Sequence, residues 1–177
     1  KHPPKPVVAG HEIVSIVREV GPQVTRVKPG DRVVHEIVTF YCGHCAACRE
    51  GRFNICNNLK PMEGRAHYMT GGAFAKYLVW PEQQLHRLPD AIDSRDAVLM
   101  EPTAGSIHSV VTRMGVKAGE SVAILGPGAR GLLLIIAVLA SRGHRDIVAC
   151  EPVERRRQRA LAVGASAAIA PGELAIP

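Results

Sequence analysis

The sequence has few aromatic residues and no long apolar run. Phenylalanine, tryptophan and tyrosine together make up 4% of its 177 residues, which excludes a platform of stacked aromatic side chains for single-stranded nucleic acid. The longest apolar stretch, residues 131–140, falls well short of the ~20 residues that a membrane-spanning helix requires. The opening residues also lack the basic and apolar segments of a secretion signal. We therefore expect a cytoplasmic protein whose partner is neither a membrane nor a nucleic acid.

Apolar residues make up 46% of the chain, which is enough for one domain, or two small ones, with an aliphatic core. The formal charge of +6 would ordinarily favour an anionic partner. The densest basic run, residues 155–159, has a helical spacing that points its arginines in several directions. We interpret this run as a solvated helix face rather than a stripe that binds nucleic acid.

The first half of the chain is predicted to be mostly β-structure. Short segments rich in valine and isoleucine are separated by turn-forming glycine and proline residues. The expected strands cover residues 7–9, 13–20, 32–38, 71–81 and 84–88. Residues 39–70 contain four cysteines and little periodicity, so we expect a lobe that is held together by something other than an apolar core.

The second half alternates between apolar runs and helical patterns. Ser94 is a candidate cap for a helix that starts at Arg95, and residues 103–114 have apolar side chains near helical spacing. The segments that follow are predicted as a strand at 121–125, a helix from 126 to 141, a strand at 146–150, a helix at 153–163 and a strand at 167–170. This βαβαβ order indicates a parallel sheet covered by helices.

The strongest chemical signal is a set of four cysteines, Cys42, Cys45, Cys48 and Cys56. Intervals of two, two and seven residues let four thiolates surround one Zn²⁺ tetrahedrally, and four protein ligands make such an ion structural. A bacterial iron–sulfur run would bring the fourth cysteine sooner and follow it with proline. Two disulfides are the other alternative, although nothing marks the chain as secreted. The fifth cysteine, Cys150, ends an apolar strand, and we interpret it as a small buried hydrophobic residue.

The second signal is a glycine-rich loop, Gly126-x-Gly128-x-x-Gly131, between an apolar strand and a helix. The glycines permit a tight turn, and the helix N-terminus offers free N–H groups to a pyrophosphate. Glu151 ends the next strand, where a carboxylate can accept hydrogen bonds from ribose hydroxyls and repel a 2′-phosphate. This favours NAD, although nearby arginines leave NADP open. Arg130 stands where a residue usually packs on the sheet, so it either reaches the pyrophosphate or lies exposed at the loop edge.

A third set of residues can be interpreted only together with the cysteines and the glycine-rich loop. Gly10-His11-Glu12 follows an apolar segment and Glu101-Pro102 lies far downstream, and alone such a His/Glu pair is more often structural than a metal ligand. Together with the other motifs, these residues resemble the zinc-dependent medium-chain dehydrogenase/reductase family over nearly the whole chain. The matching elements are Gly10-His11-Glu12, residues 30–33, the four cysteines, residues 71–75, Glu101-Pro102 with His108, the glycine-rich loop, and Glu151 with Arg156.

The resemblance implies a fold of mixed class, with a GroES-like β catalytic domain and its zinc lobe in residues 1–102 and the first half of a Rossmann domain in residues 103–177. It also implies that His11 and Glu101 hold a catalytic Zn²⁺, with Glu12 as an exchangeable ligand or a base beside the metal. The residues that it assigns to NAD binding are Gly126, Gly128, Arg130, Gly131, Glu151 and Arg156. Glutamate at position 101 favours a secondary alcohol of polyol, sugar or amino-alcohol type. The implied reaction transfers a hydride from that alcohol to NAD, in a homodimer or homotetramer.

The sequence departs from the family pattern at two places. The family has a further cysteine ligand upstream of the Gly-His-Glu motif, and residues 1–9 contain no cysteine; the nucleotide-binding pattern stops after one half. We therefore expect the central part of a longer dehydrogenase, inactive by itself. The alternative is a noncatalytic zinc-binding scaffold or interaction fragment that has lost the chemistry. His108 is predicted to be a packed helix histidine rather than a relay base.

Overall fold

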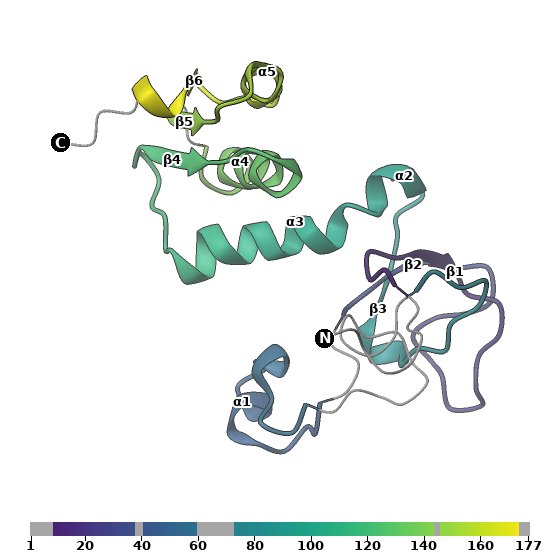
Figure 1. The fold of residues 1–177 in the computed structure, drawn as a ribbon. Coiled ribbons are helices and arrows are strands. Elements are labelled where there is room, and N and C mark those ends of the chain that lie inside the picture. Colours follow the sequence, from purple (N-terminus) through teal and green to yellow (C-terminus); the bar gives the residue numbers. More distant parts are fainter. Residues whose placement is uncertain (1–8, 38–40, 60–72, 144–145, 174–177) are drawn as a thin grey trace, which may run out of the picture. The chain divides into compact units, whose positions relative to one another are not determined.

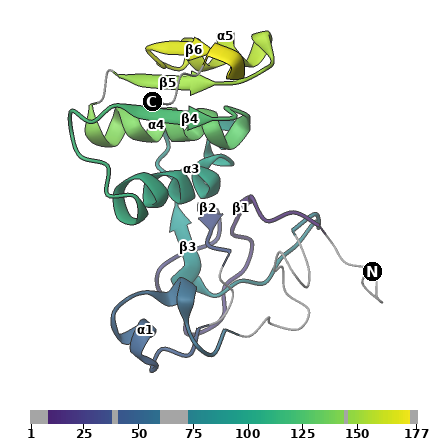
Figure 2. The same ribbon diagram turned by 60° about the vertical axis from the view of Figure 1, so that its left-hand side comes forward.

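The computed structural model of the chain describes residues 9–37, 41–59, 73–143 and 146–173. The chain forms two compact units, residues 1–101 and residues 102–177. The elements of each unit are drawn in Figure 1, and Figure 2 turns the same ribbon to show the strands from another side. Within the described part of the chain, no helix combines the length and apolar character that crossing a bilayer requires.

The first unit is built on a three-stranded antiparallel sheet. Its strands β1 (Val14–Ile16), β2 (Arg32–His35) and β3 (Leu85–Arg87) lie in the order β1-β2-β3. Successive side chains of a strand point to opposite faces, and the neighbours Val33 and Val34 accordingly enter two separate apolar clusters. The sheet therefore has a small core on each face.

These strands are shorter than the sequence predicts, and one expected strand is wrong. The segment 73–81 makes no strand among the described residues, although Ala73 and Phe74 donate backbone hydrogen bonds to Gly10 and Ala9. Phe74 is 81% exposed, and the segment lines a cleft of 1430 Å³ beside β1. Apolar alternation favours an extended chain, but a strand also needs a partner along its edge. The expected strand at 7–9 lies mostly outside the described residues.

The cysteine lobe contains two short helical turns, α1 (Ala46–Arg49) and the 3₁₀ turn η1 (Phe53–Ile55). Among its described residues, only Ala47, Cys48 and Cys56 are buried. The lobe thus lacks an apolar core of its own, as the sequence indicates. A second 3₁₀ turn, η2 (Glu82–Gln84), leads into β3.

Two helices follow the first sheet. The first, α2 (Ser94–Ala97), is capped by Asp93, whose Oδ1 accepts a 2.7 Å hydrogen bond from the Arg95 N–H. The predicted cap, Ser94, is wrong by one residue, because the carboxylate of Asp93 already accepts the hydrogen bond of a free N–H group at the start of the helix. The next helix, α3 (Met100–Ile107), continues as a π-helical segment, η3 (His108–Arg113).

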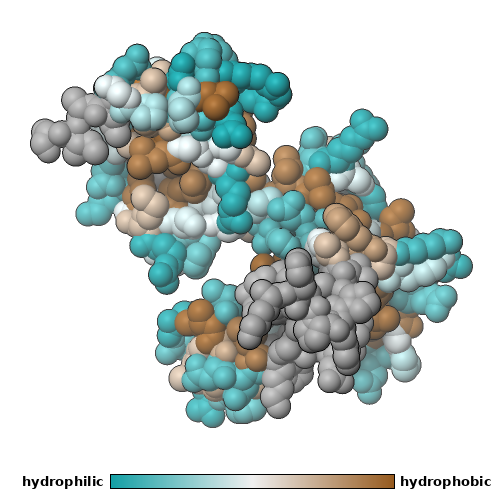
Figure 3. Space-filling view, viewed as in Figure 1, coloured by the Kyte–Doolittle hydropathy of each residue, from teal (hydrophilic) through white to brown (hydrophobic). Residues whose placement is uncertain are grey.

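The second unit has the predicted βαβαβ order. Its elements are β4 (Val122–Leu125), α4 (Ala129–Arg142), β5 (Ile147–Cys150), α5 (Glu154–Ala162) and β6 (Ala167–Ile169), followed by the 3₁₀ turn η4 (Pro171–Glu173). The strands are parallel, in the order β4-β5-β6. The core lies between sheet and helices and includes Ile135, Ile147 and Ala149. Apolar side chains also gather on the surface over β4, where Leu125 is 69% exposed (Figure 3).

Candidate metal and cofactor sites

The four cysteines of the lobe converge on one point. Their Sγ atoms lie within 4.8 Å of one another, with 3.6 Å between Cys42 and Cys56 and 3.9 Å between Cys45 and Cys56. Four sulfurs around a Zn²⁺ ion at Zn–S distances of about 2.3 Å would be separated by about 3.8 Å. All five cysteines of the chain are free thiols, so the disulfide alternative is not supported. The cluster has the ligand type and the dimensions of a closed, structural zinc site.

Backbone N–H groups hold the sulfurs in place. The N–H of Cys42 donates to Sγ of Cys56 at 3.4 Å, and the N–H of Cys45 donates to Sγ of Cys42 at the same distance. The side chain of Asn58 also donates to Cys42, and this bond is the main reason why the pKa of Cys42 falls to about 5. Burial raises the pKa of Cys48 to about 12. An ion bound by four thiolates must therefore displace a proton from Cys48.

A second group of possible ligands lies in the first unit. Ligand atoms of His11, Glu12 and Glu101 lie within 4.8 Å of one another. The first two residues stand on the chain that leads into β1, and Glu101 stands in the first turn of α3. Gly10, which precedes His11 and Glu12, has a φ of +90°, and a Cβ there would lie 2.8 Å from the Phe74 ring. The fold thus brings together residues that are 90 positions apart in the sequence.

These residues fit a zinc ion with an open coordination position. Oε2 of Glu101 is buried and has no hydrogen-bond partner among the described residues, and a buried carboxylate oxygen without a partner is costly. A metal ion would satisfy it. Imidazole and carboxylate groups are ordinary zinc ligands, and catalytic sites keep one position free for water or substrate.

The glycine-rich loop joins β4 to α4. A Cβ on Gly131 would lie 2.9 Å from the carbonyl oxygen of Gly126, so only glycine fits at position 131. Gly126 has a φ of +69°, and Gly128 is the N-cap residue of α4 without a side chain to cap it. The first N–H groups of α4 consequently have no capping side chain. This is the arrangement that binds anions at the N-terminus of a helix.

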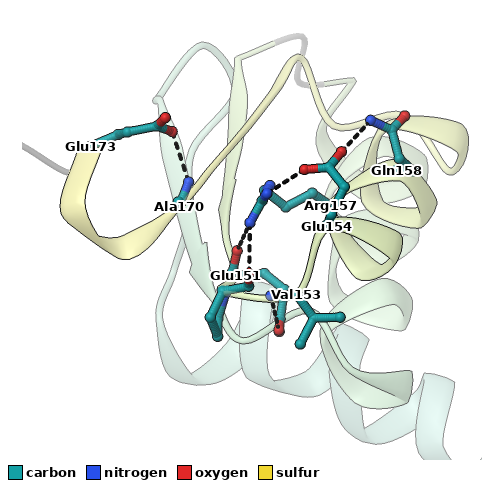
Figure 4. Close-up of polar contacts among 8 residues, drawn as sticks. Glu151, Val153, Glu154, Arg157, Gln158, Ala170 and Glu173 are labelled. Carbon is teal, nitrogen blue, oxygen red and sulfur yellow. Dashed lines mark hydrogen bonds and ion pairs between the residues drawn. The ribbon is translucent and has the colours of Figure 1, made fainter.

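Glu151 lies directly after β5, at the same sheet edge as the loop, because β4 and β5 are parallel. Its carboxylate is 2% exposed, and Oε1 accepts a 3.0 Å hydrogen bond from the Val153 N–H. Arg156 lies 3.7 Å from Oε1, and its own side chain is 55% exposed. Arg157 donates to the carbonyl oxygens of Glu151 and Pro152 and pairs with Glu154 (Figure 4). The carboxylate is therefore held in one orientation.

Two predictions about side chains have different outcomes. His108 is exposed, so its interpretation as a packed helix histidine is wrong; the backbone widens into η3 at this residue. Arg130 is exposed, in agreement with the second of its two interpretations, and its Nη2 lies 3.3 Å from the point that a Cβ on Gly105 would occupy. Cys150 is buried, as expected.

The sequence motifs alone do not predict that Arg157 shapes the turn at Glu151. Its spacing of three from Glu154 is nevertheless a signal for an ion pair on a helix.

The fold and the sites define a class of protein. An antiparallel β unit with a four-cysteine lobe, followed by a parallel unit with a glycine-rich loop, has the organisation of the zinc-dependent medium-chain dehydrogenases. The family profile of the alcohol dehydrogenase GroES-like domain matches residues 1–90. The chain therefore belongs to this family, and the predicted fold class is confirmed.

Individual relatives agree with this assignment. The chain is 38% identical to L-threonine 3-dehydrogenase from Pyrococcus horikoshii over 168 residues, which are 95% of this chain and 46% of the relative. The crystal structure of 2R,3R-butanediol dehydrogenase from Bacillus subtilis is 34% identical, with a TM-score of 0.78 over 97% of this chain and 46% of that one. An Escherichia coli alcohol dehydrogenase (rspB) complexed with NADH is 26% identical, with a TM-score of 0.83 over 96% and 49% of the two chains. The chain spans about half the length of the curated relatives it matches.

Proposed function

We propose that the chain is the metal-binding and ribose-binding part of a zinc- and NAD-dependent dehydrogenase that oxidises a secondary alcohol of polyol, sugar or amino-alcohol type. The observation that carries this proposal is the convergence of His11, Glu12 and Glu101 around a buried carboxylate oxygen that has no partner among the described residues. Glutamate rather than cysteine at position 101 supports the substrate class. Two of the relatives are named for threonine and for butanediol, which is consistent with it.

The two parts of the chain have different tasks in this proposal. Residues 1–102 are the catalytic domain, and residues 103–177 are half of the cofactor domain. A bound Zn²⁺ supplies a Lewis acid that lowers the pKa of an alcohol hydroxyl. His11 and Glu101 hold the ion, and the buried Oε2 of the half-buried Glu101 gains the partner that it lacks among the described residues. Glu12, which is exposed, accepts a proton or exchanges as a ligand.

The cofactor half positions the nucleotide. The N–H groups at the start of α4 face the pyrophosphate, and Gly128 allows its close approach. The Glu151 carboxylate accepts hydrogen bonds from the ribose hydroxyls, and its charge disfavours a 2′-phosphate. Arg156, at 3.7 Å from that carboxylate, is the residue through which NADP would bind. Arg130, which is exposed, is a further candidate contact of the pyrophosphate.

Metal content tests the proposal against the noncatalytic scaffold. We expect the complete gene product to hold two zinc ions per chain and to form NADH from a secondary alcohol. Glu101→Ala should keep the zinc of the four-cysteine site, lose the other ion and lose activity. The control is Glu19→Gln, which changes a carboxylate that is 88% exposed. A wild-type protein with only one zinc per chain would favour the scaffold instead.

A further inference from the structure

Arg32, the first residue of β2, holds the loop that follows β3. Its Nη1 donates to the carbonyl oxygen of Ile92 at 2.8 Å and to Oγ of Ser94 at 3.3 Å. Its Nη2 donates to the carbonyl oxygens of Pro89 and Asp90 at 3.0 and 3.3 Å. One guanidinium therefore collects four oxygen atoms from six consecutive residues. In the described part of the chain it makes no ion pair with a carboxylate.

The loop that Arg32 holds leads to a proposed metal ligand. It lies between β3 and α2, in the teal part of the chain (Figure 1). Asp93 caps α2, the Ala97 N–H donates to the Asp93 carbonyl oxygen, and Leu99 N–H donates to the carbonyl oxygen of Asp96. The backbone is thus hydrogen bonded from Asp93 to Leu99, and α3 with Glu101 starts at the next residue. Few free rotations separate Glu101 from the loop.

The other ligands are joined to Arg32 through the sheet. Arg32 pairs with Ile16 in the ladder between β1 and β2, and β1 follows His11 and Glu12 by a single intervening residue. Val14 of β1 packs with Ile92 and Ala97 in the apolar cluster around Val34. Arg32 therefore joins the strand that follows one pair of ligands to the loop that precedes α2 and the helix α3 of the third ligand.

We propose that Arg32 is a positioning residue for the metal site. Its hydrogen bonds to residues 89–94 determine where α2 and α3 begin relative to β1, and hence whether the Glu101 carboxylate reaches the metal that His11 and Glu12 bind. This inference rests on the proposed function, since it assumes an ion at these three residues. It assigns a role to Arg32 in assembling the site, without contact with the ion.

Arginine is suited to this role and lysine is not. The planar guanidinium presents five N–H donors in a fixed fork, and two of its nitrogens each bond two oxygens of the loop. A lysine ammonium has a single nitrogen on a flexible stem. Arg32→Lys keeps the charge but loses the span between the oxygens of Ile92 and Pro89. The variant thus loses the hydrogen bonds that need the guanidinium fork and keeps the positive charge.

The test measures zinc affinity at both sites of the same protein, by competition with a chelating indicator. In Arg32→Lys we expect the zinc of the four-cysteine site to be retained and the affinity of the second site to fall about 10-fold or more, as when supporting residues of a metal site are replaced. Ser94→Ala, which removes one of the four oxygens, should give a smaller loss in the same direction. The matched control is Arg87→Lys, because Arg87 is exposed on β3 and its side chain has no hydrogen bond among the described residues.

The outcomes separate this inference from the proposed function. If Arg32→Lys lowers the melting temperature but binds the second zinc ion as tightly as the wild type, Arg32 is only structural and the inference is overturned. The same conclusion follows if Arg87→Lys loses the second ion equally. If the wild type itself binds a single zinc ion, the proposed function fails and this inference fails with it.

Discussion

Buried polar side chains are the residues on which the proposed sites depend. Glu151 keeps a carboxylate in a nearly closed position with a backbone N–H and one arginine nearby. Glu101 buries an oxygen, Oε2, that has no partner among the described residues, and His35 buries a ring nitrogen, Nδ1, that has none there either. Burying such a group costs free energy unless something compensates it. At Glu101 we propose an ion as the compensation, and at Glu151 the Val153 N–H and Arg156 already provide part of it.

Replacing Glu151 should change the preference between NAD and NADP. Glutamine keeps an acceptor for the Val153 N–H, whereas alanine would leave that group unpaired, so Glu151→Gln is the cleaner variant. Because hydrogen bonds to charged groups contribute about 1.5–3 kcal/mol, we expect NAD affinity to fall at least about 10-fold relative to NADP. Glu154→Gln, on the exposed start of α5, should leave the ratio of the two dissociation constants unchanged. An unchanged ratio in Glu151→Gln would contradict the ribose assignment.

His35 should make the first unit sensitive to acid. Its ring is 6% exposed, Nε2 bonds to Ser15 Oγ at 2.7 Å, and burial lowers its pKa to about 4 from 6.5. The folded state therefore favours neutral His35, so this contribution to stability is complete above pH 6.5 and is lost as the pH falls toward 4. The loss amounts to about 3 kcal/mol at the acid end. Measured free energies of unfolding should fall less steeply with acid in His35→Val, and parallel curves for the two proteins would show the prediction to be wrong.

At the scale of elements, the sequence predicts best those helices and strands that show a strong local pattern, and less well those that depend on a distant partner. The strands β4 and β5 and the helix α5 lie within a residue of their predicted bounds, because apolar runs in a parallel sheet are buried on both faces and stand out in the sequence. The strand predicted at 71–81 does not form over its described part, residues 73–81, because strand pairing depends on a distant partner and not on the segment alone. Asp93 and Ser94 are adjacent residues that can both cap a helix, and no local pattern shows which of them caps α2.

The cysteine lobe is the element that most depends on a metal. Cys48→Ser should release the structural zinc and destabilise the lobe, because a closed site contributes folding free energy and serine is a poor substitute for a thiolate. We expect zinc analysis to show one ion fewer per chain, with earlier thermal unfolding. Cys150→Ser is the control, since Cys150 is also buried but lies on β5 outside the cluster. Unchanged zinc content and stability in Cys48→Ser would contradict ligation by four thiolates.

At the scale of the whole molecule, the two candidate metal sites differ in how far the sequence reveals them. The four cysteines lie within 15 consecutive residues, so their spacing alone predicts a site. His11 and Glu101 meet only through the fold, and the family resemblance was needed to connect them. No sequence pattern indicates the positioning role of Arg32, because three of its four partners are carbonyl oxygens about 60 positions away, which any residue could supply.

The scarcity of buried apolar side chains in the lobe has a consequence beyond the isolated protein. A segment that relies on an ion for its order folds only as far as that ion is supplied, since binding free energy and folding free energy are then the same quantity. During zinc starvation, freshly synthesised copies would leave the ribosome with this loop unstructured and open to proteases. The amount of folded protein would then depend on the supply of zinc in the cell.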